Sequence, residues 1–471
     1  MRFRSVMPPP MASSFRLTVR PLGRHDPIAL FRRIRKSRHP FFLDSSLREA
    51  DLARYSFLGA DPIGWFRSRG DEAAFASPWG EGRRRGPPLD ALAEFLELLP
   101  RASIGRPAYP FPGGLVGYFA YDLGRTIERV PDGKGADLGM PDIHLGIYPH
   151  VVLLDHVWGE AFVIALRERI DHDPPPIPSS LAVRRDPVAI PPLDPEAYVR
   201  TIREAKRAIY DGEIYQVNLS RRLALHLPDS PEDAYERLRT RTPSAFGGYL
   251  DVGDHKILSA SPERFLRVRG REIETRPIKG TRPRGTDPDE DRRLAEELLA
   301  SEKDAAENVM IVDLERNDLG KVCEFGSVHV PTLSGLRSLP NVHHLESVVR
   351  GRLREGVSIP DLLRATFPGG SITGAPKPRA MEIIERLEPH RRGLYTGAIG
   401  YISWDRSLDL NIAIRTATVL GRTAYFAVGG GIVADSDPHA EYRETLDKLR
   451  GHAEALTQGR VEVTADEVRV G

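Results

Sequence analysis

Cysteine is nearly absent from this 471-residue chain, where Cys323 stands alone and no disulfide can form within the chain. A chain without disulfides is typical of a reducing compartment, so we expect a cytoplasmic location and a buried, unreactive Cys323. No run of about 18 apolar residues occurs, and we expect no membrane partner. The opening MRFRSVMPPPMASS lacks the apolar core of a secretory signal, and either Met1 or Met11 fits as the start.

An excess of charge of either sign is also lacking. The 67 basic and 66 acidic residues leave a formal net charge of +1, which argues against a nucleic-acid partner. Hydrophobic residues make up 40% and charged residues 28%, an ordinary balance for a globular protein with a sizeable core.

Composition divides the chain into four regions. Residues 1–170 have the alternation of β-strands, and VVLLDHVWGEAFVIAL at 151–166 predicts a hairpin. Residues 171–194 are rich in proline and aspartate, which is typical of a linker. Residues 195–457 combine amphipathic helical patterns with glycine-rich strands, and 458–471 form an uninformative tail.

Two glycine-rich stretches are candidate ligand sites. GGSITGAP at 369–376 begins like a P-loop, but Ala-Pro replaces the required Lys-Ser/Thr and argues strongly against an NTPase. The helix expected to start at Pro376 still points free amides toward an anion, a carboxylate as well as a phosphate. An ordinary turn before a helix is the alternative. The second stretch, Gly429-Gly430-Gly431, lets the end of a strand approach a ligand closely.

Two predicted helices, 291–319 and the one opened by Asp437-Pro438, each present a pair of carboxylates on one face. The paired residues are Asp304 and Glu307 on the first helix, and Glu441 and Glu444 on the second. Carboxylates from two sides suit a divalent cation, and without zinc-type spacing of His and Cys the pattern favours Mg²⁺. The alternative is a solvated salt-bridge stripe that ends at Lys448.

Four single residues have two interpretations each. Lys279, in RPIKGTRPRG, is either a solvated loop cation or a reactive amine. Glu263 follows a strand and a Ser-Pro turn. It is either a buried general acid or a turn carboxylate paired with Arg264. His344 binds an anion or fills a core position. Arg415 is expected inside an apolar strand, LNIAIRTATV, where a guanidinium needs a carboxylate.

Eight stretches in one order resemble the chorismate-utilising enzymes: IYQVNLSRR, SASPERF, RPIKGTRPRG, IVDLERNDLGKV, FPGGSITGAPKPRAMEII, GLYTGAIGYIS, IAIRTATV and GGGIVADSDPHAEYRETLDK. That family includes anthranilate synthase component I, aminodeoxychorismate synthase component I, and isochorismate and salicylate synthases. The resemblance implies a chorismate-binding catalytic domain at 195–457 and, more loosely, a component I leader region at 1–170. It also implies an anthranilate synthase component I-like α/β fold of the α+β type, in which two antiparallel sheets pack face to face, helices flank them and the site lies between.

The resemblance assigns roles by position. Lys279 and Glu263 match the catalytic nucleophile and general acid. Glu307 and Glu444 match metal-holding glutamates, with Asp304 and Glu441 supporting, around a Mg²⁺ that holds the ring carboxylate of chorismate. The positions that match substrate or metal-shell residues are Gly280, Thr281, His344, Thr373, Tyr395, Arg415, Gly429, Gly430, Gly431 and Lys448.

Two positions separate the branches of this family. Water-using members carry a lysine where this chain has Gln216, so the resemblance implies ammonia as the nucleophile. At the position of Lys279, anthranilate synthases usually carry alanine, whereas aminodeoxychorismate synthases carry lysine, as this chain does. The sequence therefore favours formation of 4-amino-4-deoxychorismate, for 4-aminobenzoate and folate. The rivals are anthranilate synthase component I and a non-catalytic binding protein on the same fold.

In that chemistry the amine of Lys279 attacks ring carbon C2 while Glu263 protonates the departing C4 hydroxyl. The amine must be neutral, and we expect Arg276, Arg282 and Arg284 to lower its pKa if they approach it. The chain carries no recognisable glutaminase. Its ammonia would come from a glutamine amidotransferase subunit (component II) or from free ammonium, and a separate aminodeoxychorismate lyase would act next.

The leader-like motifs imply one further site, a tryptophan pocket. The residues that match it are Ser45, Arg54, Tyr55, Ser56, Pro243, Ser244 and Ala245. FLDSS stands where feedback-regulated relatives have LLES, so the sequence leaves tryptophan binding open.

Overall fold

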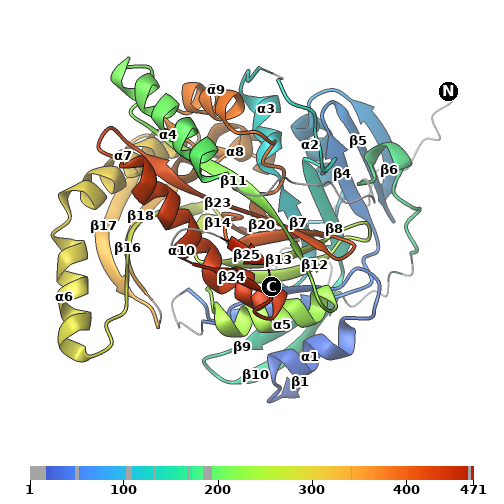
Figure 1. Ribbon diagram of the computed structural model, residues 1–471. Helices are drawn as coiled ribbons and strands as arrows, with labels where there is room; N and C mark the ends of the chain where they lie inside the picture. The colour runs from blue at the N-terminus through green and yellow to red at the C-terminus, as the bar shows by residue number, and fades with distance from the viewer. Residues whose placement is uncertain are drawn as a thin grey trace.

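The structure, a computed structural model, describes residues 17–47, 52–101, 109–131, 133–166, 170, 172–183, 194–340, 342–464 and 468–470. Within these residues, all but two strands belong to two large antiparallel sheets, and the helices lie outside the sheets (Figure 1). The two candidate start residues, Met1 and Met11, lie outside the described part of the chain.

The first sheet takes its described strands from both ends of the chain. In order across the sheet they are β1 (Leu17–Gly23), β10 (Glu160–Leu166), β9 (His150–Asp155), β3 (Tyr55–Gly59), β2 (Phe41–Asp44), β12 (Phe246–Asp251), β13 (Lys256–Ser261), β22 (Thr416–Leu420), β23 (Thr423–Ile432), β11 (Gln216–His226) and β19 (Gly374–Ala375). The early and late strands meet where β2 pairs with β12. The predicted hairpin is confirmed as β9 and β10.

The second sheet likewise takes its described strands from both ends of the chain. In order its described strands are β16 (Ile278–Pro283), β18 (Val342–Arg352), β15 (Glu272–Arg276), β14 (Arg264–Arg269), β21 (Leu408–Asn411), β20 (Ala398–Ser403), β7 (Gly114–Phe119), β8 (Ile143–Tyr148), β4 (Trp65–Arg69), β5 (Glu72–Ser77) and β6 (Gly80–Arg85), and β17 (His329–Ser338) also pairs with β18. The strands β24 (Val461–Val463) and β25 (Val468–Val470) form a separate small hairpin. Both regions of the chain thus build both sheets. The linker at 171–194 stays a prediction, since 184–193 lie outside the described residues.

The helices of the described chain are α1 (Pro27–Ile34), α2 (Pro88–Leu98), α3 (Gly124–Ile127), α4 (Pro195–Tyr210), α5 (Pro231–Arg241), α6 (Pro288–Leu299), α7 (Glu302–Gly320), α8 (Ile359–Thr366), α9 (Lys377–Leu387) and α10 (Pro438–Thr457). As predicted, Asp437 caps α10 with Pro438 in the first turn, because proline suits that turn and an aspartate oxygen accepts a free amide.

Two predicted helix boundaries are wrong. The single helix expected over 291–319 is broken into α6 and α7, because the Ser301 side chain accepts the N–H of Asp304 and starts a new helix. Such a cap is worth about 1 kcal/mol. The helix expected to start at Pro376 begins at Lys377, with Pro376 as its N-cap.

Side chains of the two sheets pack against each other to form the central layer of the core. Phe57 of β3 lies 5.6 Å, ring centre to ring centre, from Tyr401 of β20. In the same layer, Phe41 of β2 lies 4.6 Å from Tyr148 of β8. The prediction of two face-packed antiparallel sheets is therefore confirmed.

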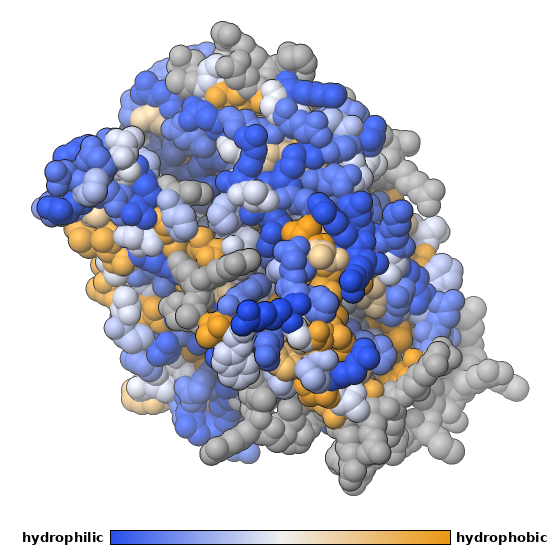
Figure 2. Space-filling view, turned by 90° about the horizontal axis from the view of Figure 1, so that it is seen from below, coloured by the Kyte–Doolittle hydropathy of each residue, from blue (hydrophilic) through white to orange (hydrophobic). Residues whose placement is uncertain are grey.

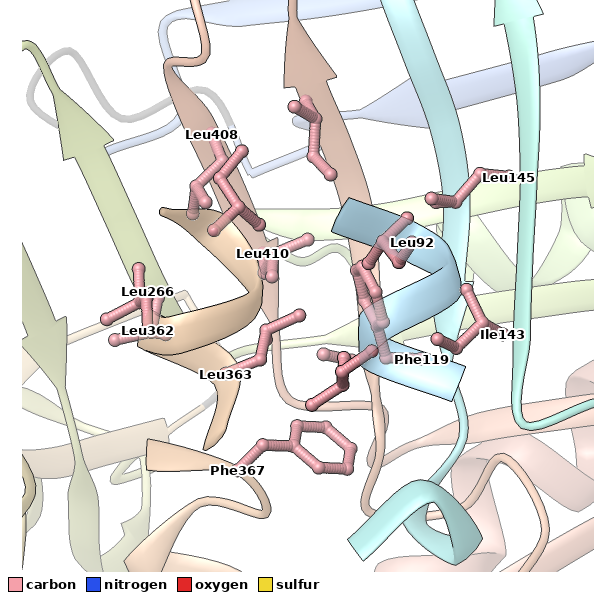
Figure 3. Close-up of a cluster of buried hydrophobic side chains, with 14 of the residues drawn as sticks. Leu92, Phe119, Ile143, Leu145, Leu266, Leu362, Leu363, Phe367, Leu408 and Leu410 are labelled. Carbon is pink, nitrogen blue, oxygen red and sulfur yellow. The ribbon is translucent and has the colours of Figure 1, made fainter. Parts of the chain in front are cut away.

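Helices cover the outer face of each sheet. Leu92 of α2 and Leu362 and Leu363 of α8 pack against strand residues such as Leu266 and Leu410 of the second sheet (Figure 3). A second cluster joins α4, α5 and α10 to the first sheet. Each fully buried leucine or phenylalanine in these clusters is worth about 1.5–3 kcal/mol.

The outer surface is mainly polar on the face shown in Figure 2, where hydrophobic side chains form smaller areas between hydrophilic ones. In the part of the chain that the structure describes, no helix is long and apolar enough to cross a membrane. Cys323 is only 2% exposed, as expected of a small buried side chain.

Candidate active site

Glu263 lies where the chain passes from the first sheet to the second, between the end of β13 and the start of β14. Its side chain is 5% exposed, and one carboxyl oxygen accepts a hydrogen bond of 2.7 Å from the Ser371 hydroxyl. Burial raises the pKa of Glu263 to about 7, although Ser371 and the Lys279 ammonium lower it. A carboxyl that keeps its proton near neutral pH has the property that a general acid needs.

The alternative partner of Glu263 is engaged elsewhere. Arg264 pairs with Glu274 at 3.0 Å and with Asp409 at 2.9 Å. The interpretation of Glu263 as a turn carboxylate paired with Arg264 is therefore wrong.

Lys279 lies on β16 and is half-buried, so it is not a freely solvated loop cation. A Cβ added to Gly431 would lie 3.4 Å from the Lys279 Nζ and 2.4 Å from the Gln216 Nε2. The three residues therefore meet at one point, where only glycine leaves room beside the amine. Burial lowers the pKa of Lys279, although the carboxylates of Glu307 and Glu263 raise it, and Lys448 adds to the lowering.

The three nearby arginines, which were expected to lower this pKa if they approached Lys279, are not among the main groups that shift it. Each of the three is paired with carboxylates: Arg276 with Glu274 and Glu346, Arg282 with Glu297 and Asp304, and Arg284 with Asp291. A guanidinium whose charge is balanced this way does little to a neighbour. Burial is the main cause of the lowered pKa instead.

Gly280 bends the strand directly after the lysine. It has a φ of 78°, and a Cβ there would lie 2.9 Å from Leu298 and 3.1 Å from Asp304, so a larger side chain does not fit. The hydroxyl of Thr281 and the Nδ1 of His344 are 2.8 Å apart. Burial lowers the pKa of His344 to about 4, with Arg415 adding to the effect, so this imidazole is neutral near pH 7.

The loop between α8 and α9 carries Ser371 to Glu263. Phe367 anchors the loop in the core, with its ring 5.9 Å from that of Phe265 (Figure 3). Thr373 is fully buried and donates to the Gly369 carbonyl at 2.9 Å. Thr373 thus uses its hydroxyl to shape the loop. Ser371 was not predicted as a site residue, because its only signal in the sequence is a hydroxyl within GGSITG.

The prediction that Arg415 lies inside a strand is wrong. It occupies the turn between β21 of the second sheet and β22 of the first, with a φ of 53°. The apolar neighbours in LNIAIRTATV reflect a chain that crosses between two sheets. Burial lowers the pKa of Arg415, which Tyr395 and Glu444 partly offset. Tyr395 itself is buried, with its ring centre 5.9 Å from the Arg392 guanidinium carbon.

Carboxylates of α7 and α10 face one another across Lys303. Its Nζ lies 4.0 Å from an oxygen of Glu307 and 4.0 Å from an oxygen of Glu441. Burial raises the pKa of both glutamates, and the neighbouring carboxylates of Asp304 and Glu444 respectively raise it further. A cation between the two helices would relieve this repulsion. Among the described residues, however, no three His, Cys, Asp or Glu side chains gather as a preformed metal site.

The remaining acidic and glycine residues lie beside this pair. Glu444 pairs with Lys448 at 2.6 Å, as in the salt-bridge alternative, and Lys448 also donates to the Gly429 carbonyl at 2.9 Å. A Cβ on Gly430 would lie 3.1 Å from Glu441, so the glycine stretch touches the acidic cluster. Mg²⁺ prefers oxygen ligands, and all the candidate ligands here are carboxylates, so their chemistry fits that ion.

A separate cavity of about 280 Å³ is lined by residues of β2, β3 and β12 of the first sheet and of β14, β20 and β21 of the second. Four of the seven residues predicted for a tryptophan pocket line it, namely Ser45, Arg54, Tyr55 and Ala245. Ser45 ties the wall together, because its hydroxyl lies 2.7 Å from the Tyr55 carbonyl and 3.1 Å from that of Ala245. Ser56 and Ser244 do not line the cavity but stabilise its wall. The Ser56 hydroxyl accepts the Ser45 N–H, and the Ser244 N–H donates to the Ser46 hydroxyl. Pro243 does not line the cavity.

The chain belongs to the family of chorismate binding enzymes, whose family model matches residues 44–454. It is 42% identical to aminodeoxychorismate synthase component 1 of Salmonella typhimurium, covering 84% of this chain and 88% of that protein. It is 40% identical to anthranilate synthase component 1 of Thermus thermophilus, covering 91% of this chain and 95% of that protein. Its fold matches the crystal structure of anthranilate synthase component I from Streptococcus pneumoniae, with a TM-score of 0.73, 33% identity and coverage of 86% and 93%. The predicted family and fold are confirmed.

Proposed function

We propose that this protein acts as an aminodeoxychorismate synthase component 1 and converts chorismate and ammonia to 4-amino-4-deoxychorismate. The observation that carries the proposal is the Lys279 amine, half-buried beside Gly431 and Gln216, with the buried carboxyl of Glu263 acting on its pKa. Relatives of both branches are about equally similar to this chain, so residue 279 carries the distinction.

In the first step the neutral amine of Lys279 attacks ring carbon C2 of chorismate. The ring double bonds shift, the C4–O bond breaks, and Glu263 donates its proton so that the hydroxyl leaves as water. The lowered pKa of Lys279 and the raised pKa of Glu263 suit these roles, because one group must be neutral and the other protonated at the same pH.

In the second step ammonia attacks C4, the double bonds shift back, and the C2–N bond to Lys279 breaks. The surplus proton of the new amine goes to the Glu263 carboxylate, which restores both residues. Gln216 supports this step, because its Oε1 is buried and has no hydrogen-bond partner among the described residues. That oxygen is available to accept a hydrogen bond from ammonia.

Mg²⁺ would be held by Glu307 and Glu444, with Asp304 and Glu441 in support, and would supply positive charge for the ring carboxylate of chorismate. Lys303, at 4.0 Å from both Glu307 and Glu441, already places a positive charge between these two carboxylates. The substrate side of the site would be formed by Arg415 and Tyr395 at the sheet crossing, with Gly280, Thr281, His344, Thr373, Lys448 and the three glycines 429–431 around it.

Ammonia would reach this site from a glutamine amidotransferase partner or from free ammonium. The relatives are named component 1, which supports a partner subunit. A separate aminodeoxychorismate lyase would then release 4-aminobenzoate.

The test is product analysis after incubation with chorismate, Mg²⁺ and ammonium, with the Lys279→Ala variant in parallel. We expect a non-aromatic amino product that yields 4-aminobenzoate only after the lyase is added, and none from the variant. Immediate anthranilate and pyruvate without lyase would make the protein an anthranilate synthase instead. Absence of chorismate consumption with Mg²⁺ present would favour a non-catalytic binding protein.

We also propose that the 280 Å³ cavity takes tryptophan. Its size is close to the lower end of about 300–1,000 Å³ for small-molecule pockets, and it combines Tyr55, Phe57 and Tyr401 with charged groups. Arg54 is already paired with Asp155 at 2.7 Å, so its guanidinium is not free to hold a carboxylate. Isothermal titration with tryptophan tests the proposal, and the absence of heat would refute it.

A further inference from the structure

A second buried glutamate lies behind Glu263, in the stretch IVDLERNDLGKV of α7. Glu315 is 2% exposed, and one of its oxygens accepts the backbone N–H of Gly370 at 2.9 Å. Its other oxygen is buried and has no hydrogen-bond partner among the described residues. The steps proposed above do not use this residue.

Glu315 and Glu263 accept hydrogen bonds from two neighbouring residues of one loop. Gly370 donates its N–H to Glu315, and the next residue, Ser371, donates its hydroxyl to Glu263 at 2.7 Å. A Cβ on Gly370 would lie 3.1 Å from the Glu315 oxygen and 2.8 Å from Leu314, so α7 lies directly against the loop. The short turn Gly370–Ile372 thus connects one carboxyl to the other.

The surroundings of Glu315 favour its neutral form. Burial raises its pKa to about 7, Asp318 adds to the rise, and Lys377 and the Gly370 amide oppose it. Lys377 is itself paired with Asp318 and donates to the Thr366 carbonyl at 3.0 Å. A neutral carboxyl offers Gly370 the same acceptor oxygen that a glutamine would offer.

We propose that Glu315 is a positioning residue for Glu263: by holding the Gly370 amide it fixes the turn that presents the Ser371 hydroxyl to the general acid. This inference rests on the proposed role of Glu263. Without the acceptor, the buried Gly370 N–H has no partner and the turn shifts to find one. The Ser371 hydroxyl then no longer donates to Glu263, and the pKa of the general acid changes.

The direction of the effect follows from the groups that face Glu263. Those groups are Lys279 of β16, Glu346 of β18, Glu315 of α7 and the Ser371 hydroxyl. Since the Ser371 hydrogen bond lowers the pKa of Glu263, its loss raises that pKa further. The acid then stays protonated to higher pH, and the alkaline limb of kcat/KM that reports its proton moves upward in pH.

The test compares Glu315→Gln, Glu315→Met and Ser371→Ala in full-length protein, with ammonium as the nitrogen donor. The glutamine variant keeps the acceptor, and we expect its pH profile to match that of the unaltered protein. The methionine variant keeps the volume but removes the acceptor. We expect its kcat to fall about tenfold, its alkaline limb to rise, and its KM for chorismate to change little.

A double-mutant cycle separates positioning from general destabilisation. We expect Glu315→Met combined with Ser371→Ala to be no worse than either single variant, because both remove one contact. Additive losses, or an unmoved alkaline limb in Glu315→Met, would overturn the inference. If that variant does not fold, a limb in Glu315→Gln that moves as in Ser371→Ala overturns it. Failure of the unaltered protein to make aminodeoxychorismate would instead refute the proposed function.

Discussion

Replacing Glu263 with glutamine is expected to make the protein more stable and far less active. The carboxyl is 5% exposed, and burial raises its pKa from 4.5 to about 7. At about 1.4 kcal/mol per pKa unit, this rise corresponds to a folding penalty of about 3 kcal/mol for the ionised form. The penalty is absent below the unfolded pKa of 4.5 and complete above about pH 7, because only the ionised form is disfavoured.

Glutamine keeps the shape and the acceptor oxygen for Ser371 but cannot ionise. We therefore expect Glu263→Gln to be more stable than the unaltered protein by up to about 3 kcal/mol near pH 8, and by close to zero near pH 4. Its kcat should fall by about 10²–10⁴-fold, because the general acid is gone.

Urea unfolding at the two pH values measures the difference, provided that the slope with denaturant is unchanged. A stability gain of the same size at both pH values would contradict this prediction, since such a gain could not come from ionisation of Glu263. Full activity in the variant would refute its role as an acid.

Three further changes test other parts of the site. Lys279→Ala removes the nucleophile, and we expect formation of aminodeoxychorismate to fall by about 10³-fold or more in a coupled lyase assay, while Lys279→Arg, which keeps the charge, does not rescue it. Gly431→Ala would place a methyl group 2.4 Å from Gln216 and 3.4 Å from Lys279, and we expect kcat to fall about tenfold or more with little change in melting temperature. Glu307→Gln removes one carboxylate from the pair around Lys303, and we expect the Mg²⁺ concentration for half-maximal activity to rise about tenfold or more in a titration of the metal. Unchanged values in any of these assays would contradict the role given to that residue.

Local patterns in the sequence predicted local structure well. The hairpin of β9 and β10 and the cap of α10 at Asp437 follow from alternation and from residues adjacent in the chain. The carboxylates of α7 and α10 were found by helical spacing, and the structure brings Glu307 and Glu441 to the same ammonium. The ordered motifs predicted the family and the fold, because they record the whole site rather than one element.

Contacts between distant parts of the chain were missed. Ser371 and Glu263 are 108 residues apart, and no local pattern announces their hydrogen bond. Arg415 was assigned to a strand because its neighbours are apolar, although the chain crosses between two sheets there. The arginines around Lys279 were expected to act on it if they approached it, but they pair with carboxylates instead, and one of these pairs, Arg276 with Glu346, joins residues 70 positions apart.

The proposed reaction is tested most sharply by finding which ring carbon receives the nitrogen. The protein would be incubated with chorismate, Mg²⁺ and ¹⁵N-labelled ammonium, and the product examined by NMR for the carbon bonded to ¹⁵N. We expect ¹⁵N on C4, para to the ring carboxylate, in a product that retains its enolpyruvyl group. Nitrogen on C2, with pyruvate released, would contradict it and leave Lys279 without the role proposed here.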